Sequence, residues 1–301
     1  MKSQYITPTV SVFDANGRPD LEQNHRLYDH IARGGVSGMV ILGSSGEFFA
    51  MDMAASRRFI DIAAAWKRPA GFRFFVGTSR MDPGESVELA NYALEKGADG
   101  VMIISPYYFP LNDDCIYDFY NRIAPRIAGP IFIYNFPDRT GYSVSPALTL
   151  KLATAFHNIT GFKDTIPGVN HTCELIRTVK AELPEFEIFS GFDNNFAHNV
   201  LSGGSGCIGG LSNVIPELFA RWIEAFASDD LAAVARMQRT IDRMMDFYAV
   251  GDPFIPMLKK GLVLRGVIDS DVCTPPFLRA TDAQAAEIRR LLEVAGCACT
   301  D

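Results

Sequence analysis

Cysteine and histidine are scarce in this sequence, and their spacing matches no common disulfide or metal motif. Six cysteines occur among 301 residues, and no two of them form a C-x-x-C pair. We interpret them as the reduced thiols of a cytosolic protein. The five histidines show neither H-x-H nor H-E-x-x-H spacing, and none falls at the end of an expected strand. The sequence therefore gives little support to a metal site.

A basic run and a long apolar run are also lacking. The formal net charge is −7 and the pI is about 5.3, which disfavours nucleic acid and anionic membranes as partners. No apolar stretch is long enough to span a bilayer, and the first residues lack the apolar core of a signal peptide. We therefore expect a cytoplasmic protein.

The chain alternates short β-branched or aromatic runs with longer stretches of helical spacing. Eight strand–helix units in about 220 residues predict a closed parallel (β/α)8 barrel, the TIM barrel of the α/β class. An open doubly wound sheet is the alternative, but it would favour a G-x-G-x-x-G turn after an early strand, and none occurs there. The expected strands are 6–13, 38–44, 72–78, 100–105, 130–136, 159–164, 186–190 and 206–210.

The C-terminal part of the chain has a different sequence pattern. Residues 231–248, 254–265 and 282–294 have helical spacing, and no strand is expected between them. No linker rich in serine, glycine or proline separates them from the rest. We predict that residues 1–228 form the catalytic barrel and that residues 229–301 form a helical extension packed on it.

Active sites in such barrels form at the carboxyl ends of the strands, so polar residues there are informative. The second expected strand runs into Ser44 and Ser45, which lie between two glycines. Such a turn can direct backbone N–H groups at an anion. A plain strand-to-helix turn explains the same residues equally well.

The sixth expected strand has the most informative end. Because strand residues alternate between two faces, Lys163 and Thr165 share one face and Phe162 lies on the other. If Phe162 faces the helices, Lys163 points into the barrel interior. A lysine amine held away from water loses its proton more readily and can attack a carbonyl carbon. The alternative is a lysine that reaches water at the barrel mouth or pairs with Asp164.

Aromatic and basic residues mark the ends of other strands. Tyr134 with Arg139 just beyond it suits proton transfer beside an anionic substrate, although a core aromatic and a solvated cation are the alternatives. Tyr108, after the fourth strand, is typical of packing or of a subunit interface. Residues 203–210 are rich in glycine. We interpret them as a strand that leaves room for substrate rather than as a phosphate-binding loop.

Taken together, these strand ends resemble the dihydrodipicolinate synthase / N-acetylneuraminate lyase family of pyruvate-dependent class I aldolases. The strand–helix layout extends the resemblance to nearly the whole chain. Six motifs in order carry it: Gly43-Ser44-Ser45-Gly46-Glu47, Pro106-Tyr107-Tyr108, Tyr134-Asn135-x-Pro137-x-Arg139-Thr140-Gly141, Gly161-Phe162-Lys163-Asp164, Ser190-Gly191 and Gly206-x-Ile208.

The resemblance implies a metal-independent lyase or synthase that needs no cofactor. Lys163 would condense with the keto group of pyruvate or of a longer 2-keto acid, and the resulting iminium would act as the electron sink. Tyr134 would carry the proton, relayed through Ser44 and Tyr108. Ser44 and Ser45 would bind the substrate carboxylate.

The resemblance also implies an assembly and two further contacts. Gly191 and Ile208 fall at substrate-binding positions of the family. Tyr108 would reach into a neighbouring subunit's site, which implies a homodimer or a homotetramer. The small-molecule partners would be pyruvate and an aldehyde.

The substrate is divided between two branches of the family. Arg139, in an R-T-G context, is typical of the synthases, where it holds the carboxylate of an aldehyde such as aspartate semialdehyde. Residues 161–166, the turn at Gly191 and residues 252–254 look more like 2-keto-3-deoxygluconate aldolases, and the synthases usually carry two threonines at Ser44 and Ser45. We expect synthase-like addition of pyruvate to an aldehyde, with retro-aldol cleavage of a 2-keto-3-deoxy sugar acid as the alternative.

Two other classes compete with this interpretation. A metal-dependent or phosphate-binding barrel enzyme would be sensitive to chelators or would bind phosphate at residues 203–210. A non-catalytic sensor of keto acids would need Ser44 and Ser45 but would have no use for an interior lysine beside Tyr134.

Overall fold

The computed structural model describes residues 1–299 and has a closed parallel barrel of eight strands in the order β1 to β8. Helices alternate with the strands, and further helices follow the last strand. The predicted TIM barrel with C-terminal helices is therefore confirmed. The strands are β1 (Gln4–Pro8), β2 (Gly38–Ile41), β3 (Arg73–Gly77), β4 (Gly100–Ile104), β5 (Ile131–Asn135), β6 (Ile159–Asp164), β7 (Glu187–Ser190) and β8 (Gly206–Ile208).

Several of the α-helices begin at residues whose side chains cap them. Asp82 accepts a hydrogen bond from the backbone of Glu85, and Ser145 accepts one from Leu148, each followed by proline at the first helical position. The helices are α1 (Leu21–Arg33), α2 (Met53–Ala65), α3 (Pro83–Glu95), α4 (Asp113–Ile123), α5 (Pro137–Thr140), α6 (Pro146–Ala155), α7 (Asn170–Val179), α8 (Phe196–Leu201), α9 (Pro216–Ala227), α10 (Leu231–Met244), α11 (Ile255–Leu264) and α12 (Asp282–Val294).

The first and last strands are shorter than the sequence predicts, because side chains replace the strand ladder there. Beyond β1, the backbone N–H groups of Val10 and Val12 donate to the side chains of Asn213 and Asn24. Beyond β8, Asn213 Nδ2 donates to the carbonyl of Gly210 and closes a 3₁₀ turn over Gly210–Asn213. Buried asparagines thus satisfy backbone groups that a longer strand would have paired.

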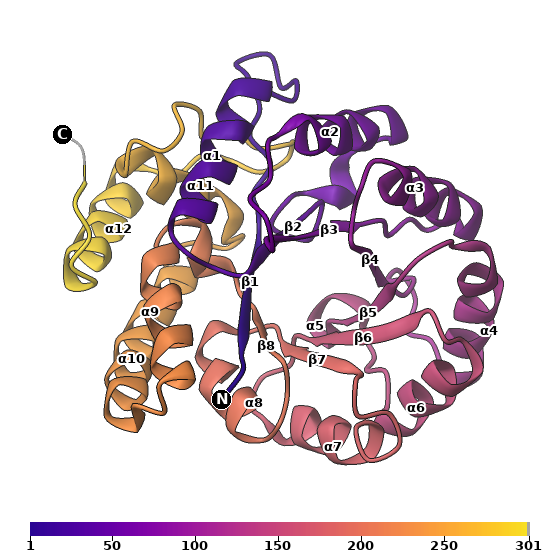
Figure 1. The fold of residues 1–301 in the computed structure, drawn as a ribbon. Helices are drawn as coiled ribbons and strands as arrows, with labels where there is room; N and C mark the ends of the chain where they lie inside the picture. The colour runs from indigo at the N-terminus through magenta and orange to yellow at the C-terminus, as the bar shows by residue number, and fades with distance from the viewer. Residues whose placement is uncertain (300–301) are drawn as a thin grey trace. The chain divides into compact units, whose positions relative to one another are not determined.

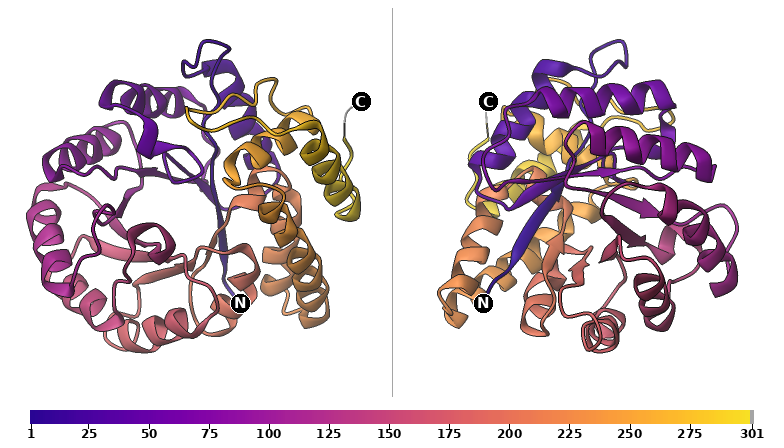
Figure 2. Two further views of the ribbon diagram at one scale, coloured as in Figure 1. Left: turned by 180° about the vertical axis from the view of Figure 1, so that it is seen from behind. Right: turned by 45° about the vertical axis from the view of Figure 1, so that its right-hand side comes forward.

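By its contacts the chain divides into two units. The first comprises Met1 with residues 5–73 and 209–301, and the second comprises residues 2–4 and 74–208. In the second unit, α3, α4, α6 and α7 lie on the outer side of the strands (Figure 1). In the first unit, α9 packs beside α10 and α11 beside α12 (Figures 1 and 2).

Aromatic rings fill the interior of the second unit. The ring centroid of Phe132 lies 5.0 Å from that of Phe75 and 6.2 Å from that of Phe189, and all three are buried. A Cβ on Gly161 would overlap the Phe132 ring, so glycine at this position makes room for it. Strand alternation places Phe132 on the same side of β5 as Tyr134. An apolar layer therefore lies next to Tyr134 along the strand.

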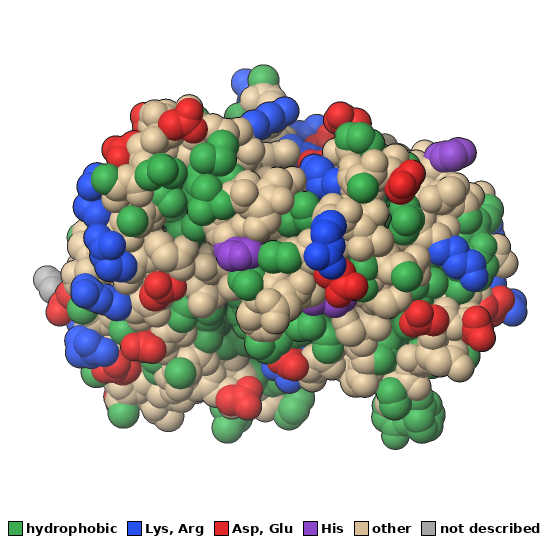
Figure 3. Space-filling model, turned by 90° about the horizontal axis from the view of Figure 1, so that it is seen from below, with side chains coloured by type: hydrophobic (Ala, Val, Ile, Leu, Met, Phe, Trp, Pro, Cys, Tyr) green, Lys and Arg blue, Asp and Glu red, His purple; other side chains and the backbone are tan. Residues whose placement is uncertain are grey.

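No described helix is both long enough and apolar enough to cross a bilayer. On the face drawn in Figure 3, acidic and basic side chains are interspersed, without a broad field of one sign.

Candidate active site

Lys163 points into the interior from the end of β6. It pairs in register with Tyr134 of β5, and its side chain is buried. Phe162 lies on the opposite face, with its ring 6.4 Å from that of His171 on α7, as the alternation predicts. The amine of Lys163 forms no hydrogen bond or ion pair with any described residue, and Nζ lies 4.3 Å from the centroid of the Tyr134 ring. The alternative in which Lys163 pairs with Asp164 is therefore wrong.

Asp164 instead joins two strands and a helix on the outer side of the barrel. Its Oδ1 accepts a hydrogen bond from Asn135 Nδ2 at 2.8 Å. Its Oδ2 accepts from His171 Nδ1 at 2.9 Å and from Thr172 Oγ1 at 2.7 Å. Asn135 and Asp164 directly follow Tyr134 and Lys163 in sequence, so this buried network fixes the strand positions from which both side chains project.

His171 has hydrogen-bond acceptors at both ring nitrogens. Its Nε2 lies 3.2 Å from the carbonyl of Val144 and 3.4 Å from Ser143 Oγ. Burial, the largest single influence, lowers the pKa of His171, but the hydrogen bond and the charge of Asp164 together raise that pKa above its ordinary value. No pattern in the sequence signals this role, because His171 belongs to a helix and does not fall at an expected strand end.

Thr165 has a buried hydroxyl without a hydrogen-bond partner among the described residues. Its backbone N–H donates to the carbonyl of Asn135 at 2.9 Å, which extends the strand ladder beyond Lys163. A Cβ on Gly191 would overlap the Thr165 hydroxyl. Gly191 is thus a glycine because Thr165 occupies the space beside it, and alternation places that hydroxyl on the same face as Lys163.

Ile208 ends β8 and is buried. Its strand pairs with β7 in a register that sets Gly206 opposite Phe189. Since Phe189 packs in the aromatic interior, alternation from Gly206 turns Ile208 to the same side. At its predicted substrate-binding position, Ile208 therefore presents an apolar side chain to the same interior as Phe189.

Arg139 and Tyr108 lie in segments that follow β5 and β4, and both are exposed to solvent. Arg139 belongs to the short helix α5, stands 5.5 Å above the ring of Phe136 and forms no ion pair with the described residues. Tyr108 is 78% exposed. Tyr142 ties the two segments together, since its hydroxyl donates to the carbonyl of Pro106 at 2.6 Å. Burial raises the pKa of Tyr142 to about 12, so its hydroxyl stays a donor.

Residues 43–47, which we call the serine turn, follow β2 in the first unit. The N–H of Gly46 donates to the carbonyl of Gly43 at 3.0 Å, and that of Glu47 donates to the carbonyl of Ser44 at 3.1 Å. Ser45 is buried. Neither its amide nor its hydroxyl has a hydrogen-bond partner among the described residues. Two unpaired donors in a glycine-flanked turn suit an anion better than a plain connection does.

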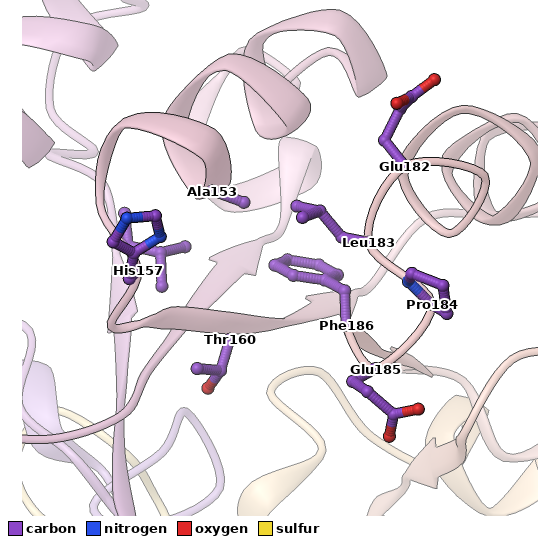
Figure 4. Close-up of a pocket in the computed structure, with 9 residues that line it drawn as sticks. Ala153, His157, Thr160, Glu182, Leu183, Pro184, Glu185 and Phe186 are labelled. Atoms are coloured by element: carbon purple, nitrogen blue, oxygen red, sulfur yellow. The ribbon is translucent and has the colours of Figure 1, made fainter.

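A cavity of about 320 Å³ opens at the amino ends of β6 and β7 (Figure 4). His157, Phe186 and Glu185 are among the residues that line it. Barrel active sites form at the opposite, carboxyl ends of the strands, so this cavity is separate from the candidate site. Within residues 1–299, no group of three or more histidine, cysteine or acidic side chains is arranged to hold a metal ion.

Comparison with known proteins gives a consistent result. The sequence model of the dihydrodipicolinate synthetase family matches residues 1–295. A relative from Escherichia coli K12, named "Probable 2-dehydro-3-deoxy-D-pentonate aldolase", is 32% identical over 294 residues, which cover 98% of this chain and 97% of the relative. A 4-hydroxy-tetrahydrodipicolinate synthase of Kosmotoga olearia is 36% identical over 198 residues, which cover 65% of this chain and 66% of the relative.

Solved structures agree with these matches. A prophage protein of the dihydrodipicolinic acid synthase family from Escherichia coli K12, crystallised in complex with pyruvate, superimposes with a TM-score of 0.94. It is 30% identical in sequence, and the alignment covers 98% of this chain and 99% of that protein.

Proposed function

We infer the function from one premise: the chain belongs to the dihydrodipicolinate synthetase family, and is thus a lyase of that family. We propose that it breaks or forms a carbon–carbon bond through a Schiff base between Lys163 and a 2-keto acid. The observation that carries this proposal is the buried side chain of Lys163, whose amine lies beside the ring of Tyr134 and forms no hydrogen bond or ion pair with a described residue. Lysine is almost never buried without a partner, and a neutral amine in such a place is suited to attack a carbonyl.

We propose a 2-keto-3-deoxy sugar acid as the substrate, cleaved to pyruvate and an aldehyde. Two observations support this choice over the synthase reaction. Two relatives matched over nearly the whole chain are named for 2-dehydro-3-deoxy acids. The unpaired hydroxyl of Thr165 lies on the same face as Lys163 and is suited to bind a substrate hydroxyl.

The proposed cleavage assigns one task to each residue. Nζ of Lys163 attacks the keto carbon, and loss of water gives the iminium. The bond between the third and fourth substrate carbons then breaks, and its electron pair moves into the iminium to form an enamine. Tyr134 takes the proton of the hydroxyl on the fourth carbon, so that this carbon leaves as an aldehyde. Protonation of the enamine and addition of water release pyruvate and restore the amine.

The two serines of the serine turn bind the substrate carboxylate or relay a proton. Ser44 and Ser45 hold the substrate carboxylate through hydroxyls and backbone N–H groups, and Ser44 passes the proton of Tyr134 onward. No metal or organic cofactor is required, because the iminium itself accepts the electron pair.

Synthase activity is the second candidate, and Arg139 favours it. Its guanidinium is exposed and forms no ion pair with the described residues. A planar double donor of this kind suits a second carboxylate, and aspartate semialdehyde carries one. A sugar acid has a single carboxylate, which the serine turn would already hold.

Trapping with borohydride tests the shared mechanism. Reduction in the presence of pyruvate should leave one adduct per chain, on the peptide that contains Lys163, and the Lys163→Met variant should show none. An adduct on Lys259 or Lys260 would overturn the assignment, and no adduct on any lysine would refute the mechanism. Turnover of a panel of 2-keto-3-deoxy acids, against pyruvate with aspartate semialdehyde, then separates the two candidates.

We also propose that Tyr108 serves the site of a second copy of the chain. Its ring is largely exposed and lies 4.9 Å from that of Phe109, which is exposed as well. Two neighbouring exposed aromatics are typical of a surface that another chain covers. Light scattering coupled to an activity assay tests this proposal, and a fully active monomer would contradict it.

A further inference from the structure

Glu47, the last residue of the serine turn, forms an ion pair with Lys259 of α11 that is wholly withdrawn from solvent. Glu47 Oε1 lies 2.5 Å from Lys259 Nζ, and both side chains are 0% exposed. They are more than two hundred residues apart in the chain. The end of the serine turn is thus tied directly to the C-terminal helices.

Further contacts fix both partners of the pair. Glu47 Oε2 accepts hydrogen bonds from the backbone N–H of Thr274 at 2.6 Å and from its hydroxyl at 2.8 Å. Lys259 Nζ donates to the carbonyl of Val272 at 2.7 Å and stands 4.6 Å from the centroid of the Phe13 ring. Each charged group therefore has one defined position, set by α11 and by the segment that follows it.

Stability alone does not account for such a pair. Two charges taken out of water lose hydration that their attraction barely restores, and well-packed apolar residues often serve equally well in their place. What an ion pair with these hydrogen bonds does provide is a fixed direction. A fixed direction matters here because Glu47, which ends the serine turn, has a positive φ of 60°, and Leu42, just before the turn, has one of 54°. Residues other than glycine keep such angles only when their surroundings hold them there.

We propose that Glu47 and Lys259 are positioning residues that hold the serine turn in the shape that binds the substrate carboxylate. This inference rests on the proposed function, in which Ser44 and Ser45 bind that group. The unpaired amide and hydroxyl of Ser45 lie two residues before Glu47, so a rotation of Glu47 alters where both donors point. The C-terminal extension thereby acts on substrate binding from outside the strand ends.

The test uses a charge-neutral double variant, Glu47→Gln with Lys259→Met. The amide oxygen of the introduced glutamine can still accept from Thr274, and no single charge is left buried. The rate of borohydride trapping is measured with pyruvate and with acetone, a ketone that has no carboxylate. We expect trapping of subsaturating pyruvate to slow roughly tenfold to a hundredfold, the usual cost of a small misplacement. Trapping of acetone should change less than about twofold, because Lys163 itself is undisturbed.

Lys260→Met is the matched control, since it removes a lysine from the same helix. Lys260 is 21% exposed and pairs with Asp271 rather than with Glu47. Asp271 keeps a second partner, Arg279 Nε at 3.4 Å, so both trapping rates should stay close to the wild-type value. Equal trapping of pyruvate by the double variant and the wild type would overturn the inference. An equal loss with pyruvate and acetone would also overturn it, because the pair would then support the whole fold and not the turn.

A milder variant covers the case in which the double variant does not fold. Thr274→Val removes one hydrogen bond to Glu47 and keeps the ion pair, so a loss of a few-fold is expected with pyruvate alone. An unchanged ratio of pyruvate to acetone trapping in that variant would refute the positioning role. If the wild type itself traps neither ketone, the proposed function fails, and that outcome is distinct from each of these.

Discussion

Lys163 and Tyr134 form a register pair across β5 and β6, and Nζ of the lysine lies 4.3 Å from the centroid of the tyrosine ring. The electron-rich face of an aromatic ring attracts a cation more strongly when water is excluded. In the proposed mechanism, the ring of Tyr134 would therefore favour the cationic iminium on Lys163. The proposal thus gives Tyr134 two separable roles, one through its ring and one through its hydroxyl.

Replacing Tyr134 with phenylalanine should separate these roles. The ring and its packing remain, so the yield of the pyruvate adduct should stay close to the wild-type value. Turnover should fall by ~10²–10⁴, the usual contribution of a positioned proton carrier. Adduct mass and steady-state turnover measured on the same preparation check both expectations. Turnover close to wild type would return Tyr134 to the role of a core aromatic.

Thr165→Val should lower activity without harming the fold. The substitution keeps the shape of the side chain and removes a buried hydroxyl that has no partner among the described residues, so the thermal midpoint should hold or rise slightly. If that hydroxyl binds a sugar-acid hydroxyl, the fall in kcat/KM should correspond to a loss of ~0.5–1.5 kcal/mol of transition-state stabilisation, the contribution of an ordinary hydrogen bond. Pyruvate trapping supplies the control and should not change. An unaltered kcat/KM with the best sugar acid would exclude Thr165 from substrate binding.

Arg139→Ala discriminates between the two candidate substrates. For a sugar acid, Arg139 has only hydroxyls to contact, so its loss should cost about 0.5–1.5 kcal/mol in kcat/KM. For aspartate semialdehyde, the loss of a charge-assisted double hydrogen bond should raise the KM of the aldehyde markedly and leave pyruvate adduct formation unchanged. Arg139 is exposed, so its removal should leave the fold intact. A large effect on the aldehyde, together with faster synthase turnover, would contradict the choice of a sugar acid.

The His171–Asp164 contact should make stability depend on pH. The pKa of His171 is raised in the fold by Asp164, so this contribution is fully present below the unfolded value of about 6.5 and is lost as the pH rises through the raised pKa. Asp164 and Glu174 are the acidic groups that act on the ring. The thermal midpoint of the wild type should exceed that of His171→Gln by more at pH 6 than at pH 9.

A second histidine supplies the control for this experiment. His157 forms no ion pair with a described residue, so His157→Gln should shift the midpoint by a similar amount at both pH values. A difference between wild type and His171→Gln that does not change with pH would contradict the assigned charge of the ring.

The direction of Lys163 could be predicted from sequence because it depends on local periodicity alone. The apolar Phe162 beside it indicates which face of the strand packs against the helices. Because side chains alternate between the two faces, Lys163 must then point into the barrel. The same rule identifies Gly161 and Thr165 as inward-facing. The eight strands were likewise predictable, although Asn24 and Asn213 shorten the first and last by supplying side-chain partners from distant segments.

The supporting contacts of the site could not be predicted, since they join residues with no common pattern in sequence. Asp164 could be seen as a partner for Lys163, whereas its carboxylate turns outward to His171 on a helix. Glu47 is separated from Lys259 by most of the chain. Contacts of this kind depend on the assembled fold, and one sequence taken alone carries no signal for them.

The amine of Lys163 forms no hydrogen bond or ion pair with a described residue, so the fold gives up free energy at the position that we propose to be the nucleophile. The side chain of Lys163 is 4% exposed, so its amine is hydrated much less than in the unfolded chain, and that loss of hydration costs free energy. The apolar side chain of methionine in Lys163→Met would not incur this cost. The inactive variant should therefore melt at a higher temperature than the wild type. Catalytic activity and thermal stability therefore favour different residues at this position, and selection for thermal stability alone would be expected to replace the lysine.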